Sequence, residues 1–491
     1  MSEIVVVGGG FAGLSAASYL AKAGHKVTLL EKNNQLGGRC RSFKEEGFTF
    51  DMGPSWYWMP DVFEKYFGDF GFKASDFYRL TRLDPSYRVF YNDKSTFDIP
   101  ADYDQLQGLF EDIETGSAEK LDAFLSDAKH KYQIGLGEFV YKPSLSITEF
   151  MDIRILKDAF RMDLFKSISG EIRKKFKDPK LIQLLEFPVL FLGAKPNQTP
   201  ALYSLMNYAD IKLGTWYPDG GMVEIPKAMS KIVHDLGVQV KLGEVVQELR
   251  TEARLIKGVK TNHSFYECDA IISSADYHHT ETKLLPSNLR SYSDQYWESR
   301  VMAPSSLLFY IGTDRKIPNL LHHNLFFDAD FDEHASLIYD KPSWPDNPLF
   351  YACCPSKTDA TVAPEGSENI FLLVPLSAGL KDNMQEREAL FDILVARLKQ
   401  HTGVDIKEHI VYKRSFCVED FKTEYNSFKG NAYGLANTLK QTALLKPRLK
   451  SKKIKNLYFA GQLTTPGPGV PPSLISGKVA AEELSKQLRR S

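Results

Sequence analysis

Two short apolar runs, separated by a helical pattern, open the chain. Residues 3–7 form a run that predicts a buried β-strand, and residues 14–23 have the apolar spacing of a helix. A second apolar run at 27–30 predicts another strand, which ends at Glu31. Strand, helix and strand in this order predict two parallel strands joined by a crossover helix.

The same alternation returns in the middle and at the end of the chain. A helix is expected near 225–236, followed by a strand at 238–242 and an extended stretch at 245–246. Residues 456–459 predict a further strand and 474–484 a helix, with glycines and prolines between them. Such a segment fixes a turn whose backbone N–H groups can face a ligand, although a purely structural connection has the same composition.

Three glycines join the first strand to its helix. Gly8, Gly10 and Gly13 have the GxGxxG spacing of a dinucleotide-binding turn, in which Gly8 permits the sharp turn. Gly10 then lets the backbone approach a pyrophosphate, and Gly13 lets helix and strand pack closely. Glu31 has the position of an acid that binds ribose hydroxyls. An ordinary strand–helix–strand corner is the alternative, but the complete order of elements favours the dinucleotide.

The residues after Glu31 favour FAD over NAD. A second glycine pair with a basic residue, Gly37-Gly38-Arg39, is followed by Arg41 and by the segment 50–55. Arginines bind phosphate oxygens in bidentate fashion, so these residues indicate contact with a longer and more anionic cofactor. No second GxGxxG occurs, so we expect no separate NAD(P)H domain. The electrons should leave to an acceptor other than a bound nicotinamide.

Composition excludes several other classes of protein. The 491 residues include 61 basic and 62 acidic side chains, which gives no electrostatic case for nucleic acid. Five cysteines form neither a CxxC pair nor a metal spacing, so we expect no metal site and no disulfide relay, and their odd number suits a reducing cytoplasm. The first strand begins at residue 3, which leaves no room for a signal peptide.

Two segments bear on membranes. The longest apolar run, 181–194, is interrupted by Gln183, Glu186 and Pro188, so we expect core, tunnel lining or an interfacial segment and not a span. Residues 154–177 are predominantly basic, with apolar residues at helical spacing, and such a helix could lie on an anionic bilayer. A solvated helix whose apolar face packs on the core would have the same pattern.

Motifs spread over nearly the whole chain point to one family. They are the glycine motifs above, Phe50-Asp51-x-Gly53-Pro54-Ser55, Trp216-Tyr217-Pro218-Asp219-Gly220-Gly221-Met222, Ser274-Ala275-Asp276, Leu321-His322-His323-Asn324, Cys354-Pro355-Ser356-Lys357-Thr358-Asp359, Ala363-Pro364-Glu365-Gly366, and the segment from Asn456 to Lys478. Together they resemble the bacterial phytoene desaturase family, whose members are flavin-dependent carotenoid desaturases of the amine oxidase-like superfamily.

The resemblance implies an α/β fold with a discontinuous Rossmann-like FAD-binding domain. We expect that domain to comprise residues 1–75, 216–276 and 431–491. An inserted α+β substrate domain would comprise 76–215 and 277–430, including a helical segment at about 150–200 that could dock on a membrane. Insertions of this size usually close a ligand cavity over the dinucleotide site.

The resemblance also extends the set of expected cofactor contacts. The predicted FAD-binding residues are Gly8, Gly10, Phe11, Ala12, Gly13, Glu31, Lys32, Gly37, Gly38, Arg39, Gly53, Pro54, Ser55, Val245, Val246, Ala275, Asp276, Gly461, Gln462, Pro468, Gly469, Val470 and Ser473. Val245 and Val246 could instead belong to an ordinary core strand. Gln462 departs from many relatives, which carry an acid against the ribityl chain, but its amide oxygen can still accept a hydrogen bond.

The chemistry implied is removal of two hydrogens from a CH–CH bond beside a polyene. Flavin would accept the hydride, so no acid–base pair is required. Glu149 is the candidate carboxylate for stabilising a cation or accepting the proton, although Thr148-Glu149 is also an ordinary helix start. His322, His323, His278 and His279 are interpreted as structural or surface residues.

The predicted function is therefore stepwise conversion of phytoene towards lycopene, with a lipid-soluble polyene as substrate and quinone or oxygen as electron acceptor. The protein would be cytoplasmic and peripheral on the inner face of the cell membrane, with no nucleic-acid partner. Three alternatives stay open: a related desaturase, saturase or isomerase acting on another polyene, an amine oxidase, and a flavin-bearing protein that carries carotenoid without converting it.

Overall fold

A five-stranded parallel sheet forms the base of the molecule. The computed structural model describes all residues except 147–148, 150–162, 164–165, 439 and 491. The strand order is β19-β13-β1-β2-β9, in which the strands are β1 (Glu3–Val7), β2 (Lys26–Glu31), β9 (Gln239–Leu242), β13 (Ala270–Ser273) and β19 (Leu457–Phe459). All four pairings are parallel. The predicted α/β class with a Rossmann-like sheet is confirmed.

This sheet is assembled from three segments that are far apart in the sequence. The first segment supplies β1 and β2, the second β9 and β13, and the third β19. All five strands fall within the intervals 1–75, 216–276 and 431–491, which were expected to form the cofactor domain. The exact domain limits stay a prediction.

Helices cover one face of the parallel sheet. They are α1 (Phe11–Lys22), α9 (Glu224–Asp235) and α15 (Val470–Arg490). The helix predicted at 14–23 begins earlier, at Phe11, directly after the glycine turn. The helix predicted at 474–484 begins at Val470, because Pro471 and Pro472 fall in its first turn, where a missing N–H costs nothing.

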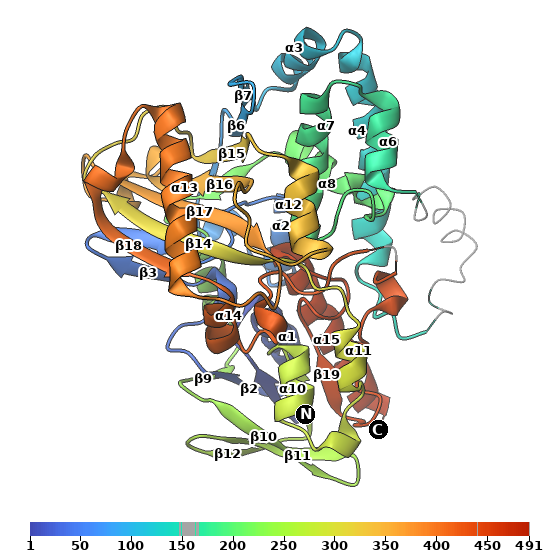
Figure 1. The fold of residues 1–491 in the computed structure, drawn as a ribbon. Coiled ribbons are helices and arrows are strands. Elements are labelled where there is room, and N and C mark those ends of the chain that lie inside the picture. Colours follow the sequence, from blue (N-terminus) through green and yellow to red (C-terminus); the bar gives the residue numbers. More distant parts are fainter. Residues whose placement is uncertain (147–148, 150–162, 164–165, 439, 491) are drawn as a thin grey trace.

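A second, seven-stranded sheet lies above the first (Figure 1). Its order is β18-β14-β17-β16-β15-β6-β7, in which the strands are β6 (Tyr87–Tyr91), β7 (Thr96–Ile99), β14 (Ser305–Thr313), β15 (His323–Phe327), β16 (Phe350–Cys353), β17 (Glu368–Leu376) and β18 (Ile410–Phe416). Helix α13 (Met384–Thr402) packs on one face through Leu390, Phe391 and Leu394. The opposite face is turned towards the cavity described below.

A helical region lies beside the second sheet. It contains α2 (Pro60–Asp69), α3 (Tyr103–Ile113), α4 (Ser117–Ile134), α6 (Ile168–Lys175), α7 (Pro179–Glu186) and α8 (Leu205–Tyr208). The apolar run 181–194 is part of α7 and a following 3₁₀ helix, Phe187–Leu192, and Leu181, Leu185 and Phe187 are buried. Within the described residues, no helix combines the length and apolarity needed to cross a membrane.

The basic segment 154–177 is only partly described, and most of the proposed docking helix lies outside the described residues. Its described end, α6, buries Ile168 and Ile172 against the core and leaves Lys174 exposed in an ion pair with Glu171. This arrangement suits either interpretation of the segment.

The remaining elements are short and connect the two sheets. They are β3 (Ser42–Glu45), β4 (Phe48–Asp51), β5 (Leu80–Arg82), β8 (Trp216–Pro218), β10 (Val246–Glu252), β11 (Leu255–Thr261), β12 (Phe265–Glu267), α10 (Tyr277–Lys283), α11 (Asp294–Glu298), α12 (Phe331–Tyr339) and α14 (Val418–Tyr425). β10, β11 and β12 form a small antiparallel sheet on the free face of the parallel sheet.

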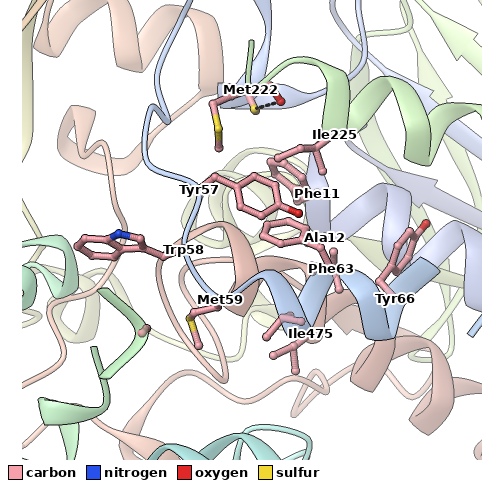
Figure 2. Close-up of a cluster of buried hydrophobic side chains, with 14 of the residues drawn as sticks. Phe11, Ala12, Tyr57, Trp58, Met59, Phe63, Tyr66, Met222, Ile225 and Ile475 are labelled. Atoms are coloured by element: carbon pink, nitrogen blue, oxygen red, sulfur yellow. Dashed lines mark hydrogen bonds between the residues drawn. The ribbon is translucent and has the colours of Figure 1, made fainter. Parts of the chain in front are cut away.

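Part of the core lies where α1 meets α15 and α2. Figure 2 shows Phe11 and Ala12 of α1 beside Phe63 and Tyr66 of α2, with Ile475 of α15 close by. The Ser15 hydroxyl donates to the carbonyl of Leu474 at 2.7 Å, which ties the two helices together. A Cβ at Gly477 would overlap the carbonyl oxygen of Ala12, so α15 can approach α1 only through a glycine.

Replacing this glycine should destabilise the protein. Gly477→Ala forces α1 and α15 apart, and overpacking of this kind costs about 1–3 kcal/mol. We expect a lower midpoint of thermal unfolding, measured by circular dichroism. Gly108→Ala is the matched control, because Gly108 also lies within a helix but a Cβ there meets nothing within 4 Å. That variant should be stabilised by about 0.5–1 kcal/mol. Equal midpoints for the two variants would contradict the close packing.

Candidate cofactor and substrate site

One large cavity runs between the two sheets. Its volume is about 1080 Å³, and it is lined at one end by the glycine turn and at the other by the seven-stranded sheet. Typical pockets for a single small ligand measure about 300–1,000 Å³, so this cavity has room for a cofactor and a second ligand. Because both ends belong to one continuous space, a cofactor and a substrate could meet inside it.

The glycine turn forms the floor of the cofactor end. Gly8 has φ +97°, a conformation that favours glycine, and its N–H donates to the carbonyl of Leu30 at 2.8 Å. A Cβ at Gly13 would overlap the carbonyl oxygen of Gly8, so strand and helix pack as the sequence predicted. The N-terminus of α1 therefore opens on the cavity, where its partial positive charge favours an anion.

Gly10 differs from the other two glycines. A Cβ at Gly10 would come no closer than 3.8 Å to any protein atom, the Cα of Gly38, and its φ of −80° suits any residue. Neither strain nor crowding by the protein therefore requires a glycine here. Gly10 lines the cavity, so the space that a side chain would fill belongs to the cavity. This is the fit expected for a pyrophosphate that lies against the backbone.

Glu31 is held rigidly at the end of β2. Its Oε2 accepts from the N–H of Gly9 at 2.7 Å, and its Oε1 accepts from the backbone and side-chain nitrogens of Asn33 at 2.8 and 2.9 Å. The side chain is buried but lines the cavity. These bonds orient the carboxylate and leave lone pairs for hydroxyl donors, which suits the ribose role.

Arg39, Asp276 and Gln462 meet near Asn431. The Arg39 guanidinium lies over the ring of Tyr425 at 4.9 Å and donates to Ser427 Oγ at 3.2 Å. The Gln462 amide fits its neighbours better turned over, which lets its oxygen accept from Arg39 Nη2 at 2.9 Å. The predicted hydrogen bond of this amide oxygen to the ribityl chain stays a prediction.

Electrostatics in this group suit a polar ligand. Desolvation lowers the pKa of Arg39, and its buried Nε has no hydrogen-bond partner among the described residues. Burial raises the pKa of Asp276 to about 6, although the carboxylate accepts from the N–H groups of His279 and Phe428. A buried donor without an acceptor costs about 1–3 kcal/mol, so the residues fit a cofactor that supplies acceptor atoms.

The other end of the cavity is mainly apolar. Its wall is made by residues of β14, β15, β16, β17 and α12, together with aromatic side chains from the loop before α2 and from the 3₁₀ helix Phe187–Leu192. These residues include Leu308, Leu325, Phe327, Phe350, Tyr351, Leu373, Ile338, Trp56, Trp58 and Phe187. Leu444 lines the cavity, whereas the adjacent Leu445 does not line it and is 56% exposed, so the short 3₁₀ helix Ala443–Leu445 lies between the cavity and the surface. A long apolar molecule is the natural occupant of such a space.

The cavity gathers nearly all the predicted site residues. Every predicted FAD contact lines the cavity except Gly13, at which α1 packs closely against the end of β1. Val245 lines it while 41% exposed, which does not fit the alternative of a core strand at that residue. Contact with FAD itself stays a prediction for each residue.

Glu149 does not line the cavity. Its carboxylate accepts from the backbone N–H groups of Ser144, Leu145 and Ser146 at 2.8, 2.9 and 3.0 Å, so it closes a local turn. In the structure Glu149 stabilises this turn, and its catalytic role stays a prediction without geometric support.

Sequence reasoning missed two parts of the site. Glu424 and Tyr425 of α14 line the cofactor end, although they belong to the interval 277–430 that was expected to hold only substrate. The individual residues of the apolar wall were not identified either, because the apolar content of 76–215 and 277–430 suits a tunnel and a plain core equally. In both cases the signal lies in long-range packing and not in a local motif.

The chain is similar to several characterised proteins. The model of the flavin containing amine oxidoreductase family matches residues 11–485. The carotenoid 3,4-desaturase of Haloarcula japonica is 42% identical, covering 99% of this chain and 98% of the relative. The zeta-carotene-forming phytoene desaturase of Myxococcus xanthus is 31% identical, covering 98% and 93%. The 4,4'-diapophytoene desaturase of Staphylococcus haemolyticus is 32% identical, covering 99% of both.

Solved structures share the fold. An oxidoreductase from Methanosarcina mazei superposes with a TM-score of 0.63 at 16% identity, covering 98% of this chain and 100% of that one. A putrescine oxidase bound to putrescine gives 0.61 at 14% identity, covering 98% of both. At such identities the likeness shows the fold alone.

Gly10→Val should abolish retention of FAD without unfolding the protein. The new side chain meets no protein atom closely but fills the space opposite the helix N-terminus. We expect loss of the flavin absorption that co-purifies with the chain, while circular dichroism stays unchanged. A folded Gly10→Val protein that retains flavin at wild-type stoichiometry would contradict the position of the site.

Proposed function

The chain belongs to the flavin-containing amine oxidoreductase family and, within it, to the carotenoid desaturases, and on this premise we propose that it desaturates a linear carotenoid. The enzyme is an FAD oxidoreductase that acts on CH–CH bonds. The observation that carries the proposal is the single cavity that joins the dinucleotide turn to a long apolar chamber.

Two desaturation steps are candidates. The sequence motifs predict stepwise conversion of phytoene towards lycopene. The comparisons favour a second candidate, desaturation of the 3,4 bond of an already conjugated carotenoid, because the relative with that name is 42% identical and the phytoene and diapophytoene desaturases are 31–32% identical. Both steps remove hydrogen from a CH–CH bond beside a polyene, so both use the same site.

The cavity wall suits this reaction because it excludes water. FAD, when bound, supplies the two-electron acceptor for the hydrogen that leaves first with its electron pair. The electron-poor carbon chain that remains is stabilised by its own conjugation, and Trp56, Phe187 and Phe327 keep water from adding to it. The neighbouring carbon would then lose a proton to water or to a nearby carboxylate, and the electron pair of that C–H bond would form the new double bond.

The amine oxidase alternative is less consistent with the site. A small polar amine would leave most of the apolar chamber unfilled, and the three relatives described above are carotenoid desaturases. A saturase or isomerase of another polyene would use the same cavity, so a product assay has to separate them. Quinone or oxygen is the proposed electron acceptor.

The position of the cavity opening suggests how a lipid-soluble substrate enters. Leu445 is 56% exposed and lies next to Leu444, which lines the cavity. Apolar side chains that surround an opening can enter the headgroup region of a bilayer and let a polyene pass without crossing water. We therefore propose a peripheral protein on the inner face of the cell membrane, with this opening towards the lipid.

The substrate can be identified by offering two carotenoids in liposomes. The FAD-loaded protein is mixed with quinone and either phytoene or an already coloured linear carotenoid, and absorption spectra and chromatography follow the products. We expect new bands at longer wavelength with at least one of them, because each added double bond extends the conjugation. Binding of either carotenoid while the flavin stays oxidised, with no new pigment, would identify a carrier and contradict desaturation. Gly10→Val is the control for flavin dependence.

Leu445→Glu should weaken membrane binding. Burying a leucine contributes about 1.5–3 kcal/mol, so loss of even a partial insertion should reduce pelleting with liposomes about tenfold. Met384→Glu is the matched control, because Met384 is 57% exposed but begins α13, on the far side of the second sheet from the cavity. Equal pelleting of the two variants would show that the bilayer does not contact the cavity opening.

A further inference from the structure

Three metal-binding side chains meet behind the apolar wall. His322, His323 and Cys353 are 4%, 0% and 1% exposed, and one ligand atom from each lies within 4.8 Å of the other two. No other group of this kind occurs among the residues that the structure describes. The group lies outside the cofactor site, and desaturation as described above does not use it.

Strand pairing brings these residues together. His323 begins β15 and Cys353 ends β16, and the antiparallel register places the two directly opposite each other. Side chains opposite each other in such a pair lie on one face, about 4.5–5.5 Å apart at Cβ. His322 precedes the strand, and its ring meets that of His323 edge to face with centroids 4.5 Å apart.

The hydrogen bonds leave one nitrogen of each ring free. His322 Nδ1 is 2.8 Å from Thr358 Oγ1, and His323 Nδ1 is 2.6 Å from the hydroxyl of Tyr351. The Nε2 atoms of both rings are buried without a partner among the described residues. Histidines that bind metals usually hydrogen-bond through one ring nitrogen to an oxygen and bind the metal through the other.

Burial favours the neutral form of both imidazoles and lowers the pKa of each below its usual value. A neutral imidazole keeps a lone pair on one nitrogen. Binding of a metal to Cys353 would release the thiol proton.

We propose that His322, His323 and Cys353 form a binding site for one Zn²⁺ ion. Two imidazoles and a thiolate are ligands that Zn²⁺ prefers, and three protein ligands leave a fourth position open. A small cavity of about 20 Å³ adjoins two of the three ligands, His322 and Cys353, and has room for about one water molecule.

The geometry requires only a small rearrangement. Ligand atoms on one tetrahedral Zn²⁺ lie about 3.5 Å apart, given bonds of about 2.0–2.3 Å. Atoms that are at most 4.8 Å apart reach this spacing by moving little more than 1 Å. Asp51 lines the same small cavity, and burial raises the pKa of its carboxyl to about 7. A nearby cation would favour its ionised form, which would offset part of the buried charge.

The ion would stiffen the cavity wall from behind. Trp56 stacks on His323 with ring centroids 4.0 Å apart and an angle of 11° between the rings. The Tyr351 hydroxyl donates to Ser55 Oγ at 2.9 Å. Trp56, Tyr351 and Ser55 all line the large cavity, so fixing His323 fixes the surface against which a ligand lies.

The site is tested by titrating metal into the flavin-loaded protein after treatment with a chelator under reducing conditions. Equilibrium dialysis with Zn²⁺ and elemental analysis gives the stoichiometry. Co²⁺ then serves as a spectroscopic probe, read at wavelengths longer than those absorbed by flavin. We expect one tightly bound ion per chain, a tetrahedral Co²⁺ spectrum, and a higher midpoint of thermal unfolding with Zn²⁺.

Cys353→Ser should weaken binding by at least tenfold and abolish the rise in thermal midpoint. Cys354→Ser is the matched control, because that neighbouring thiol is equally buried but packs in the core on the other face of the sheet. His322→Gln provides a second test should Cys353→Ser not fold. Retained flavin shows that a variant is folded. No stoichiometric ion in the wild type, or the same affinity in Cys353→Ser and Cys354→Ser, would overturn the proposal.

Discussion

The close approach of backbones at the glycine turn is the constraint on which the rest of the structure depends. β1 passes into α1 so tightly that a side chain at Gly13 would overlap the carbonyl of Gly8, and α15 reaches α1 only through Gly477. Helices α1 and α15, which come from opposite ends of the chain, are thus held together on one face of the parallel sheet. Because both N-termini lie at the carboxyl end of the parallel sheet, backbone N–H groups from both ends of the sequence face a single space.

The second sheet supplies the apolar wall of that space. One face is occupied by α13, so the other face is free to line a cavity, and its strands are apolar on both sides. This division explains how the fold can hold a charged cofactor and an apolar ligand in one continuous volume. The charged side chains Arg39, Glu31 and Asp276 line the end made by the parallel sheet, and Glu31 is buried there. Burial of a lipid-soluble molecule is favourable at the other end, which is lined by apolar side chains.

Local sequence patterns predicted the cofactor end well because its residues act through the backbone near them. Gly8, Gly10 and Glu31 lie within one strand–helix–strand unit, and their roles follow from a spacing that can be read directly. Contacts across the chain could not be read in this way. Tyr425 reaches Arg39 from α14, and the partners of His323 are set by the register of β15 on β16. Glu149 shows a further limit of local patterns, because a matching position in a motif does not reveal that three backbone N–H groups donate to the carboxylate.

The pair of unpartnered imidazole nitrogens behind the wall is difficult to explain by packing alone. Each buried polar atom without a partner costs about 1–3 kcal/mol, and leucine or phenylalanine at either position would avoid that cost. The strand register places Cys353 opposite His323, and its thiol hydrogen-bonds to the Tyr351 hydroxyl, so the thiol lies beside the two imidazoles. A metal ion satisfies all three groups at once and also accounts for the hydroxyl partners on both Nδ1 atoms. The same ion would join β15 to β16 directly beneath the surface on which the carotenoid lies, so the rigidity of that surface would depend on a site that the substrate never touches.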